Sequence, residues 1–313
     1  MENISDGLKH RFHDPKMRQQ YVELFNRVMQ DLEVAKFLQD NSDVLSRSDI
    51  VKGFSKLYEF MTLKEEIKAG KKTYVPGYEP HLITSDHQIE VVYRPTKEYT
   101  QNQQENKLKK AIQQIGLPKS LINARIENYD LDGREEPLRA ALQFIDGCSA
   151  YLLKHQNHFP KGLYLSGSLG VGKSYLLAAT AIKLVEKGIE TKYYHFPTFS
   201  GEMMNSIGEN RTSQLINQVK NYPVVIFDDI GSTQITPWMR DNVLGIILEY
   251  RMSNELPTLF SSNLSIDELR DQYLTVSNKG DSEPLKAMRI TERIRFLANE
   301  YQMVGPNRRN FQN

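Results

Sequence analysis

The sequence predicts an α/β protein with a parallel sheet, preceded by a small, mainly helical α+β domain. Three observations support this prediction. Apolar runs typical of strands alternate with helical stretches in the second part of the chain. A glycine-rich phosphate-binding pattern lies between one such run and a helix, which is the context that this pattern requires. A polar stretch separates this region from an N-terminal region that has its own apolar periodicity.

Composition excludes several classes of protein. The 313 residues suffice for about two domains, and 39% of them are hydrophobic, so each domain can form a core. The net charge is only +1, so any contact with nucleic acid must come from a local basic patch. The one cysteine, Cys148, excludes an internal disulfide and a multi-cysteine zinc site. No signal peptide or membrane span is predicted, and we expect a cytoplasmic protein.

Residues 1–95 are expected to form the N-terminal domain. Apolar residues at helical spacing predict one helix over 15–38 and a second helix over 48–68. Two short β-rich runs, 81–84 and 88–93, flank a turn signal and predict a hairpin. Together these elements make a small α+β unit.

A polar linker is expected over residues 96–107, where Gln and Asn replace apolar residues. Residues 108–313 then form the second domain. Its apolar strand-like runs lie at 162–165, 191–196, 224–229 and 258–262. Because helices alternate with these strands, the sheet should be parallel, with a ligand site at the carboxyl ends of its strands.

The sequence GSLGVGKS matches the phosphate-binding pattern G-x-x-x-x-G-K-[ST] of P-loop proteins. The glycines let backbone N–H groups turn toward phosphates, and the following helix N-terminus adds partial positive charge. Lys173, on a loop expected to face solvent, should contact the β and γ phosphates of ATP, and the Ser174 hydroxyl should bind Mg²⁺. The expected nucleotide-binding residues of this loop are Gly167, Ser168, Gly170, Val171, Gly172, Lys173, Ser174 and Tyr175.

Polar side chains follow two of the apolar runs. The run VVIF ends in Asp228 and Asp229, and TLFSS ends in Asn263. We expect Asp228 to hold Mg²⁺ through water and Asp229 to polarise the attacking water, a role more often held by Glu. Asn263 is expected at the γ-phosphate if its strand lies beside the Asp-Asp strand; otherwise it caps the following helix. The sequence thus predicts an Mg-dependent ATPase.

Several segments together resemble the primosomal helicase loaders of the DnaI/DnaC type, which are AAA+ ATPases. They are the P-loop, LPKSLINARIENYD before it, the region FDDIGSTQ to LFSSN, and RITERIRFLANEY. The N-terminal helical unit with GYEP and IEVVYRP also resembles the helicase-binding domain of the Gram-positive loaders. The resemblance implies a protein that places a hexameric replicative helicase on single-stranded DNA. It also implies self-association through ATPase interfaces.

The resemblance assigns roles that spacing alone does not. Arg289 falls where these loaders carry an arginine finger that reaches the ATP of a neighbouring subunit, and Arg293, one helical turn later, is the alternative. Arg308, beside Arg309, falls where a sensor arginine touches the nucleotide phosphates. The expected DNA contacts come from an extra helical element after the run 191–196, through Phe199, Arg211 and Lys220.

One departure from the relatives concerns zinc. Many Gram-positive loaders bind zinc through cysteines near the GYEP segment, whereas this chain has none there. His81 and His87 do not make a closed tetrahedral site by themselves. We therefore expect no zinc, with apolar packing holding the domain together.

Two other functions remain open at this point. A transposition-helper ATPase of the insertion-sequence type shares the C-terminal architecture and would use its N-terminal region for DNA or transposase. A small-molecule P-loop kinase is the second alternative, although it needs no arginine from a neighbouring subunit. Binding of a hexameric helicase by the N-terminal region distinguishes the three.

Overall fold

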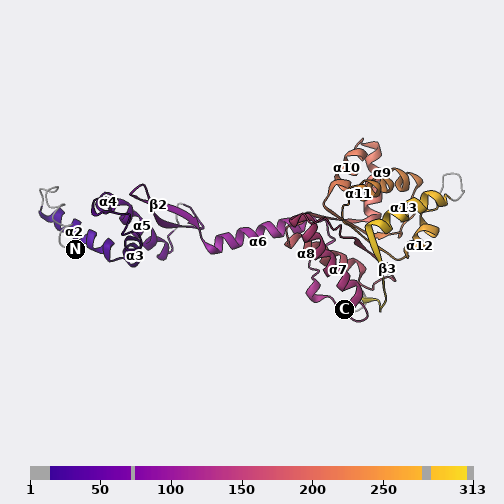
Figure 1. Ribbon diagram of the computed structural model, residues 1–313, viewed down its shortest axis with the longest axis horizontal. Helices are drawn as coiled ribbons and strands as arrows, with labels where there is room; N and C mark the ends of the chain where they lie inside the picture. Colours follow the sequence, from indigo (N-terminus) through magenta and orange to yellow (C-terminus); the bar gives the residue numbers. More distant parts are fainter. Residues whose placement is uncertain (1–14, 72–74, 277–282, 309–313) are drawn as a thin grey trace. The chain divides into compact units, whose positions relative to one another are not determined.

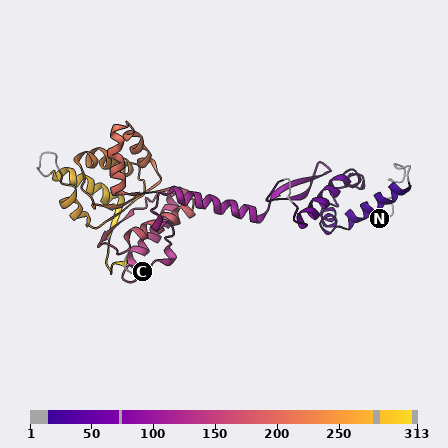
Figure 2. The ribbon, with the colours of Figure 1, turned by 180° about the vertical axis from the view of Figure 1, so that it is seen from behind.

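The structure, a computed structural model, describes residues 15–71, 75–276 and 283–308. The chain divides into two compact units, Met1–Asn106 and Lys107–Asn313. Figures 1 and 2 show both units from opposite sides. No helix in the described ranges is long and apolar enough to cross a membrane.

The first unit contains four helices and a hairpin in its described part. These elements are α2 (Pro15–Gln30), α3 (Leu32–Asp40), α4 (Arg47–Lys52), α5 (Phe54–Lys68), β1 (Tyr78–Ser85) and β2 (Gln88–Pro95). Eight buried hydrophobic residues form its core, namely Val28, Val34, Leu45, Phe54, Leu57, Phe60, Met61 and Ile89. The hairpin predicted over 81–93 is therefore present and contributes Ile89 to this core.

Both predicted helices of this unit are interrupted. The first breaks at Asp31, whose side chain accepts hydrogen bonds from the backbone N–H groups of Glu33 and Val34 and so begins α3. The second breaks at Gly53, where an added Cβ would lie 2.9 Å from the Ile89 side chain. Apolar periodicity continues across both breaks, so it could not reveal them.

The segment predicted to be a polar linker is helical. It lies in α6 (Lys97–Gln114), which has no buried residue. The boundary between the two units falls within this helix. A helix that is polar on all sides can form where i,i+4 pairs support it, and Gln103 does bond to Tyr99 in this way.

The second unit contains a five-stranded sheet, with all strands parallel. The strands are β3 (Gly162–Gly167), β4 (Thr191–His195), β5 (Val224–Ile230), β6 (Thr258–Ser262) and β7 (Ala298–Met303), and their order is β4-β5-β6-β3-β7. The four apolar runs are strands as predicted. β7, a strand beside β3, was not predicted.

Helices cover both faces of this sheet. One hydrophobic cluster joins it to α7 (Glu135–Cys148) and α8 (Lys173–Glu186). Another joins it to α9 (Phe196–Gly208), α10 (Thr212–Asn221), α11 (Gly245–Ser253) and α13 (Pro284–Leu297), and Figure 1 shows these helices opposite α7 and α8. The shorter helical segments are η1 (Lys119–Leu121), η2 (Ile126–Asn128), η3 (Ser149–Leu153), η4 (Met239–Leu244), α12 (Ile266–Glu268) and η5 (Leu269–Tyr273). The expected α/β fold with a parallel sheet is confirmed.

Candidate nucleotide-binding site

The loop between β3 and α8 has the geometry of a phosphate-binding loop. Gly167, Gly170 and Gly172 have φ values of +143°, +82° and +100°, which favour glycine. A Cβ on Gly167 would lie 2.1 Å from the backbone oxygen of Met303, and one on Gly170 would lie 1.9 Å from Asn307 Oδ1. The loop backbone lies so close to its neighbours that a residue with a side chain does not fit at these two positions.

Lys173 lies inside this loop and is only 6% exposed, so the expectation that it faces solvent is wrong. Its Nζ donates to the backbone oxygens of Gly167 at 2.6 Å and Ser168 at 2.8 Å. It also donates to Asn263 Oδ1 at 2.9 Å, which joins the loop to the end of β6. The structure therefore brings Lys173 and Asn263 together, as their predicted roles require.

Asp228 is buried at the end of β5 and is held by two hydroxyl groups. Tyr193 on β4 donates to Oδ2 at 2.5 Å, and Ser261 on β6 donates to Oδ1. Burial and the Asp228 carboxylate raise the pKa of Tyr193, which stays protonated as a donor. The sequence did not indicate Tyr193 or Ser261, because each is more than 30 residues from Asp228.

Asp229 lies where the pairing of β5 with β6 becomes irregular. Its φ of +62° is uncommon for a residue other than glycine, and such backbone strain is often found at functional sites. Its carboxylate lies 3.5 Å from Asn263 Nδ2 and 3.9 Å from His195 Nε2. Asp229 thus faces Asn263 and His195, whereas Asp228 is held by side chains of the neighbouring strands β4 and β6.

These residues line a cavity of about 590 Å³. Its other wall comes from seven residues of the segment 118–134 before the P-loop, which the sequence did not indicate. There Tyr129 stacks on Tyr175 at a centroid distance of 6.2 Å, and Arg134 donates to the backbone oxygen of Val171 at 3.0 Å. The only signal for this wall was the segment LPKSLINARIENYD, to which the resemblance gave no role.

Known proteins match both units. A model of the primosomal protein DnaI N-terminus matches residues 1–93, and a model of the bacterial DnaA ATPase domain matches residues 147–264. The chain is 33% identical over 316 residues to the replicative helicase loader DnaI of Bacillus subtilis (strain 168), an alignment that covers 99% of each protein. The chain belongs to the DnaI family.

Two solved structures resemble the ATPase unit of this DnaI-type chain. A crystal structure of DnaI is 34% identical with a TM-score of 0.52, and it covers 60% of this chain and 95% of that chain. A structure reported as a primosome component of Streptococcus pyogenes serotype M3 is 39% identical with a TM-score of 0.50. That match covers 64% of this chain and 97% of the other. The fold is that of an AAA+ ATPase, as the sequence predicts.

Arg308 lies at the mouth of the same cavity in this DnaI-type ATPase unit. Its backbone N–H donates to the oxygen of Gly170 at 3.1 Å. Its guanidinium pairs with Asp130 and lies 3.7 Å from Asp132. Arg308 is thus beside the P-loop, as expected for a nucleotide contact, while Arg309 lies outside the described residues.

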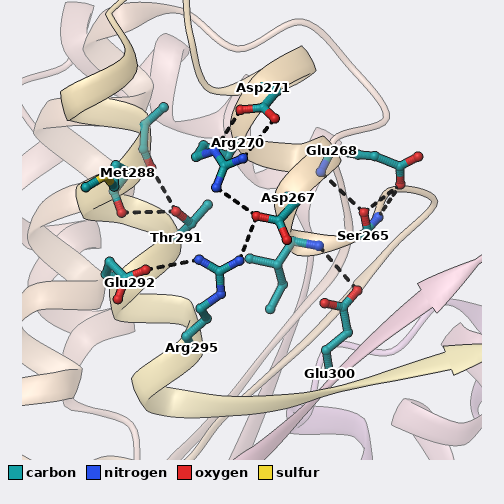
Figure 3. A network of polar contacts seen from close by, with 12 residues as sticks. Ser265, Asp267, Glu268, Arg270, Asp271, Met288, Thr291, Glu292, Arg295 and Glu300 are labelled. Atoms are coloured by element: carbon teal, nitrogen blue, oxygen red, sulfur yellow. Dashed lines mark hydrogen bonds and ion pairs between the residues drawn. The ribbon is translucent and has the colours of Figure 1, made fainter.

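The two candidate fingers on α13 have different surroundings. Arg293 donates to the oxygen of Gly245 and to Glu249, both at 2.9 Å, which ties α13 to α11. Arg289 is exposed and has no polar partner among the described residues. Figure 3 shows a second tie at the end of α13, where Asp267 accepts from Arg270 at 2.7 Å and from Arg295 at 2.8 Å. Of the two, only Arg289 is exposed and without a polar partner in the described part of the chain.

The predicted DNA contacts need one correction. Phe199 is only 4% exposed because it packs between Tyr194, Phe196 and Phe227, so it cannot stack on a base. Arg211 is exposed and pairs with Glu209. Lys220 lies 4.7 Å above the ring of Tyr250. Only Arg211 and Lys220 remain candidates for contact with DNA phosphates.

Proposed function

We propose that this chain is an ATP-dependent loader that binds the replicative DNA helicase and places it on single-stranded DNA. The observation that carries this proposal is the 33% identity to the helicase loader DnaI, which extends over 99% of both proteins and therefore includes both units. Helicase binding is assigned to residues 1–106. Nucleotide binding, DNA binding and self-association are assigned to residues 107–313.

ATP hydrolysis follows from the residues around the cavity. Lys173 offsets charge on the γ-phosphate, Asn263 orients the attacking water, and Asp229 accepts its proton. Arg289 of a neighbouring subunit completes the charge stabilisation. An isolated subunit therefore hydrolyses ATP slowly, and assembly on DNA accelerates it.

The donor set of the site fits Mg²⁺. The Ser174 hydroxyl and the Asp228 carboxylate would hold the ion, since both are hard oxygen ligands. Each oxygen of Asp228 accepts one hydroxyl hydrogen bond and keeps a lone pair for a metal-bound water. Bound Mg²⁺ would supply positive charge beside the β and γ phosphates.

The loader is favoured over the two alternatives by the N-terminal region. The match to the DnaI N-terminus covers residues 1–93, which a transposition helper would use for another partner. A small-molecule kinase would need no exposed arginine such as Arg289. DNA contact through Arg211 and Lys220 belongs to the same proposal.

A binding and transfer assay tests the proposal. The full chain, residues 1–106 and residues 107–313 are each incubated with a purified hexameric replicative helicase, with and without ATP. We expect the full chain and residues 1–106 to bind, and only the full chain to promote unwinding of a forked DNA coated with single-strand-binding protein. Absence of binding by the full chain to the helicase of the same organism would contradict the loader function.

A further inference from the structure

The carboxylate of Asp130 lies between two arginines of the nucleotide cavity. Asp130, Arg134 and Arg308 all line this cavity. Asp130 Oδ2 pairs with the guanidinium of Arg308. Asp130 Oδ1 lies 3.6 Å from Arg134 Nη2, which is beyond hydrogen-bonding distance. In the structure, Asp130 is therefore paired with Arg308 and only close to Arg134.

The pairing of Arg308 competes with any contact between this arginine and phosphate. The backbone N–H of Arg308 donates to the oxygen of Gly170, so the residue is held on the P-loop. Both of its terminal nitrogens face carboxylates, Nη1 that of Asp130 and Nη2 that of Asp132 at 3.7 Å. A triphosphate offers the same kind of charged acceptor to the guanidinium. Because 55% of the Asp130 side chain is exposed, breaking its ion pair costs little.

Arg134 lacks partners for two of its donors. It is 2% exposed, and its Nη1 donates to the oxygen of Val171 at 3.0 Å. In the described part of the chain, its Nε and Nη2 have no hydrogen-bond partner. Buried donors without a partner destabilise a protein. Asp130 Oδ1 needs to move by less than about 1 Å to accept a hydrogen bond from Nη2.

We propose that Asp130 is a positioning residue that exchanges Arg308 for Arg134 when ATP binds. In the first arrangement, which is that of the structure, Asp130 holds Arg308. In the second arrangement, Arg308 contacts the phosphates and Asp130 accepts from Arg134 Nη2. ATP favours the second arrangement because it supplies the acceptor for Arg308, and Arg134 gains the partner that it lacks. This inference rests on the proposed binding of ATP.

Two replacements of Asp130 separate the two halves of the exchange. Asp130→Asn removes the charge that holds Arg308 but keeps an oxygen that can accept from Arg134, so ATP affinity should rise about 3- to 10-fold. Asp130→Ala also removes the acceptor for Arg134. The loss of that contact offsets the release of Arg308, so affinity should stay within about 2-fold of the parent chain. Calorimetry with the full chain measures both affinities, and thermal melts check that each variant is folded.

Two further variants control for charge. Glu136→Gln removes the same charge from an exposed residue of α7 that does not line the cavity, and it should leave ATP affinity unchanged. In an Arg308→Ala background, the gain from Asp130→Asn should fall to about 2-fold or less, because the competing partner of Asp130 is gone.

Three results would overturn the inference. The first is an Asp130→Asn variant that binds ATP no more tightly than the parent chain. The second is an equal gain in affinity from Asp130→Asn and Asp130→Ala, because Arg134 would then take no part. The third is a gain from Asp130→Asn that persists in full without Arg308. Failure of the parent chain to bind ATP contradicts the proposed function instead.

Discussion

The two units differ in the kind of residue that they bury. The described part of the first unit, residues 15–71 and 75–106, buries no polar or charged side chain. The second unit buries Arg134, Lys173, Asp228 and Arg251, together with several hydroxyl groups. Because a buried polar group is costly unless it is paired, such groups are found where architecture or chemistry requires them. In the described residues, the buried charged groups that could take part in chemistry therefore lie in the second unit.

Within the second unit, a buried charge alone does not indicate a site. Arg251 is fully buried, yet it donates to Thr258 and to the backbone oxygens of Lys220, Tyr222 and Pro257. Its hydrogen bonds are internal, so its role is to join α10, α11 and β6. Arg134 and Lys173 differ because they face a cavity.

The largest expected effect is the loss of ATP affinity when the lysine of the P-loop is removed. Lys173→Ala should weaken ATP binding about 100-fold or more, because two charge-assisted hydrogen bonds to phosphate are lost. The variant should still fold, since water in the open cavity can replace the lysine at the Gly167 and Ser168 oxygens. Calorimetry measures the affinity, and circular dichroism checks the fold. Normal ATP turnover by a folded variant would show that the phosphate site is assigned wrongly.

Replacing the two carboxylates one at a time tests their different orientations. Asp229→Asn should retain Mg·ATP affinity within about 3-fold and lose about 100-fold or more in hydrolysis, because it keeps size but cannot accept a proton. Asp228→Asn should instead weaken Mg·ATP binding, since its carboxylate is proposed to hold the metal ion through a bound water. The measurements are equilibrium binding and phosphate release. If Asp229→Asn abolishes binding as well, Asp229 is a metal ligand.

The arginines of α13 provide a third test. Arg289→Ala should leave ATP affinity intact and remove the ATPase activity that assembly on DNA stimulates, by about 100-fold or more. Arg293→Ala should mainly lower stability, by about 1–2 kcal/mol, because it loses its bonds to Gly245 and Glu249. Phosphate release and thermal melts distinguish the two.

Mixing variants sharpens this test. An Arg289→Ala subunit and a Lys173→Ala subunit carry defects on opposite sides of one interface, so their mixture should contain some complete sites and regain partial activity. The finger in trans is contradicted if no mixture recovers activity and turnover per subunit is independent of protein concentration.

These residues also show what a sequence can and cannot predict. The P-loop was predictable because its pattern is contiguous, and four of the five strands because they read as apolar runs, whereas β7 is mostly polar and was not predicted. Tyr193 and Ser261 were not predictable, since only folding brings them to Asp228. Phe199 was misread because an aromatic residue near basic residues suggests stacking, whereas tertiary packing places it in the core.

The breaks in the N-terminal helices have the same origin. Asp31 and Gly53 interrupt elements whose apolar periodicity continues on either side. Gly53 is needed because Ile89 of the hairpin packs against it, a contact between residues far apart in sequence. Local patterns therefore identified the elements, and long-range contacts determined where they end.

The smallest expected effect is that of ATP and of a metal chelator on the first unit. Residues 1–106 should fold alone, bind the helicase with equal affinity with and without ATP, and keep their melting temperature in a chelator. Their eight-residue apolar core supplies the stability, and every residue assigned to ATP lies in the other unit. Among the described residues, no group of three or more His, Cys, Asp or Glu could hold a metal ion. Thiolates supply much of the free energy of a structural zinc site, and this unit has none, because the only cysteine is Cys148.

Elemental analysis and thermal melts of this fragment make the measurement, and the full chain under the same chelator serves as the control. Stoichiometric zinc, or a melting temperature that falls in the chelator, would overturn the metal-free prediction. A helicase affinity that changes with ATP in the fragment would show that the first unit has a nucleotide site of its own. Such a result would contradict the comparison of the two units, because nucleotide binding would then not be confined to the unit that buries polar groups.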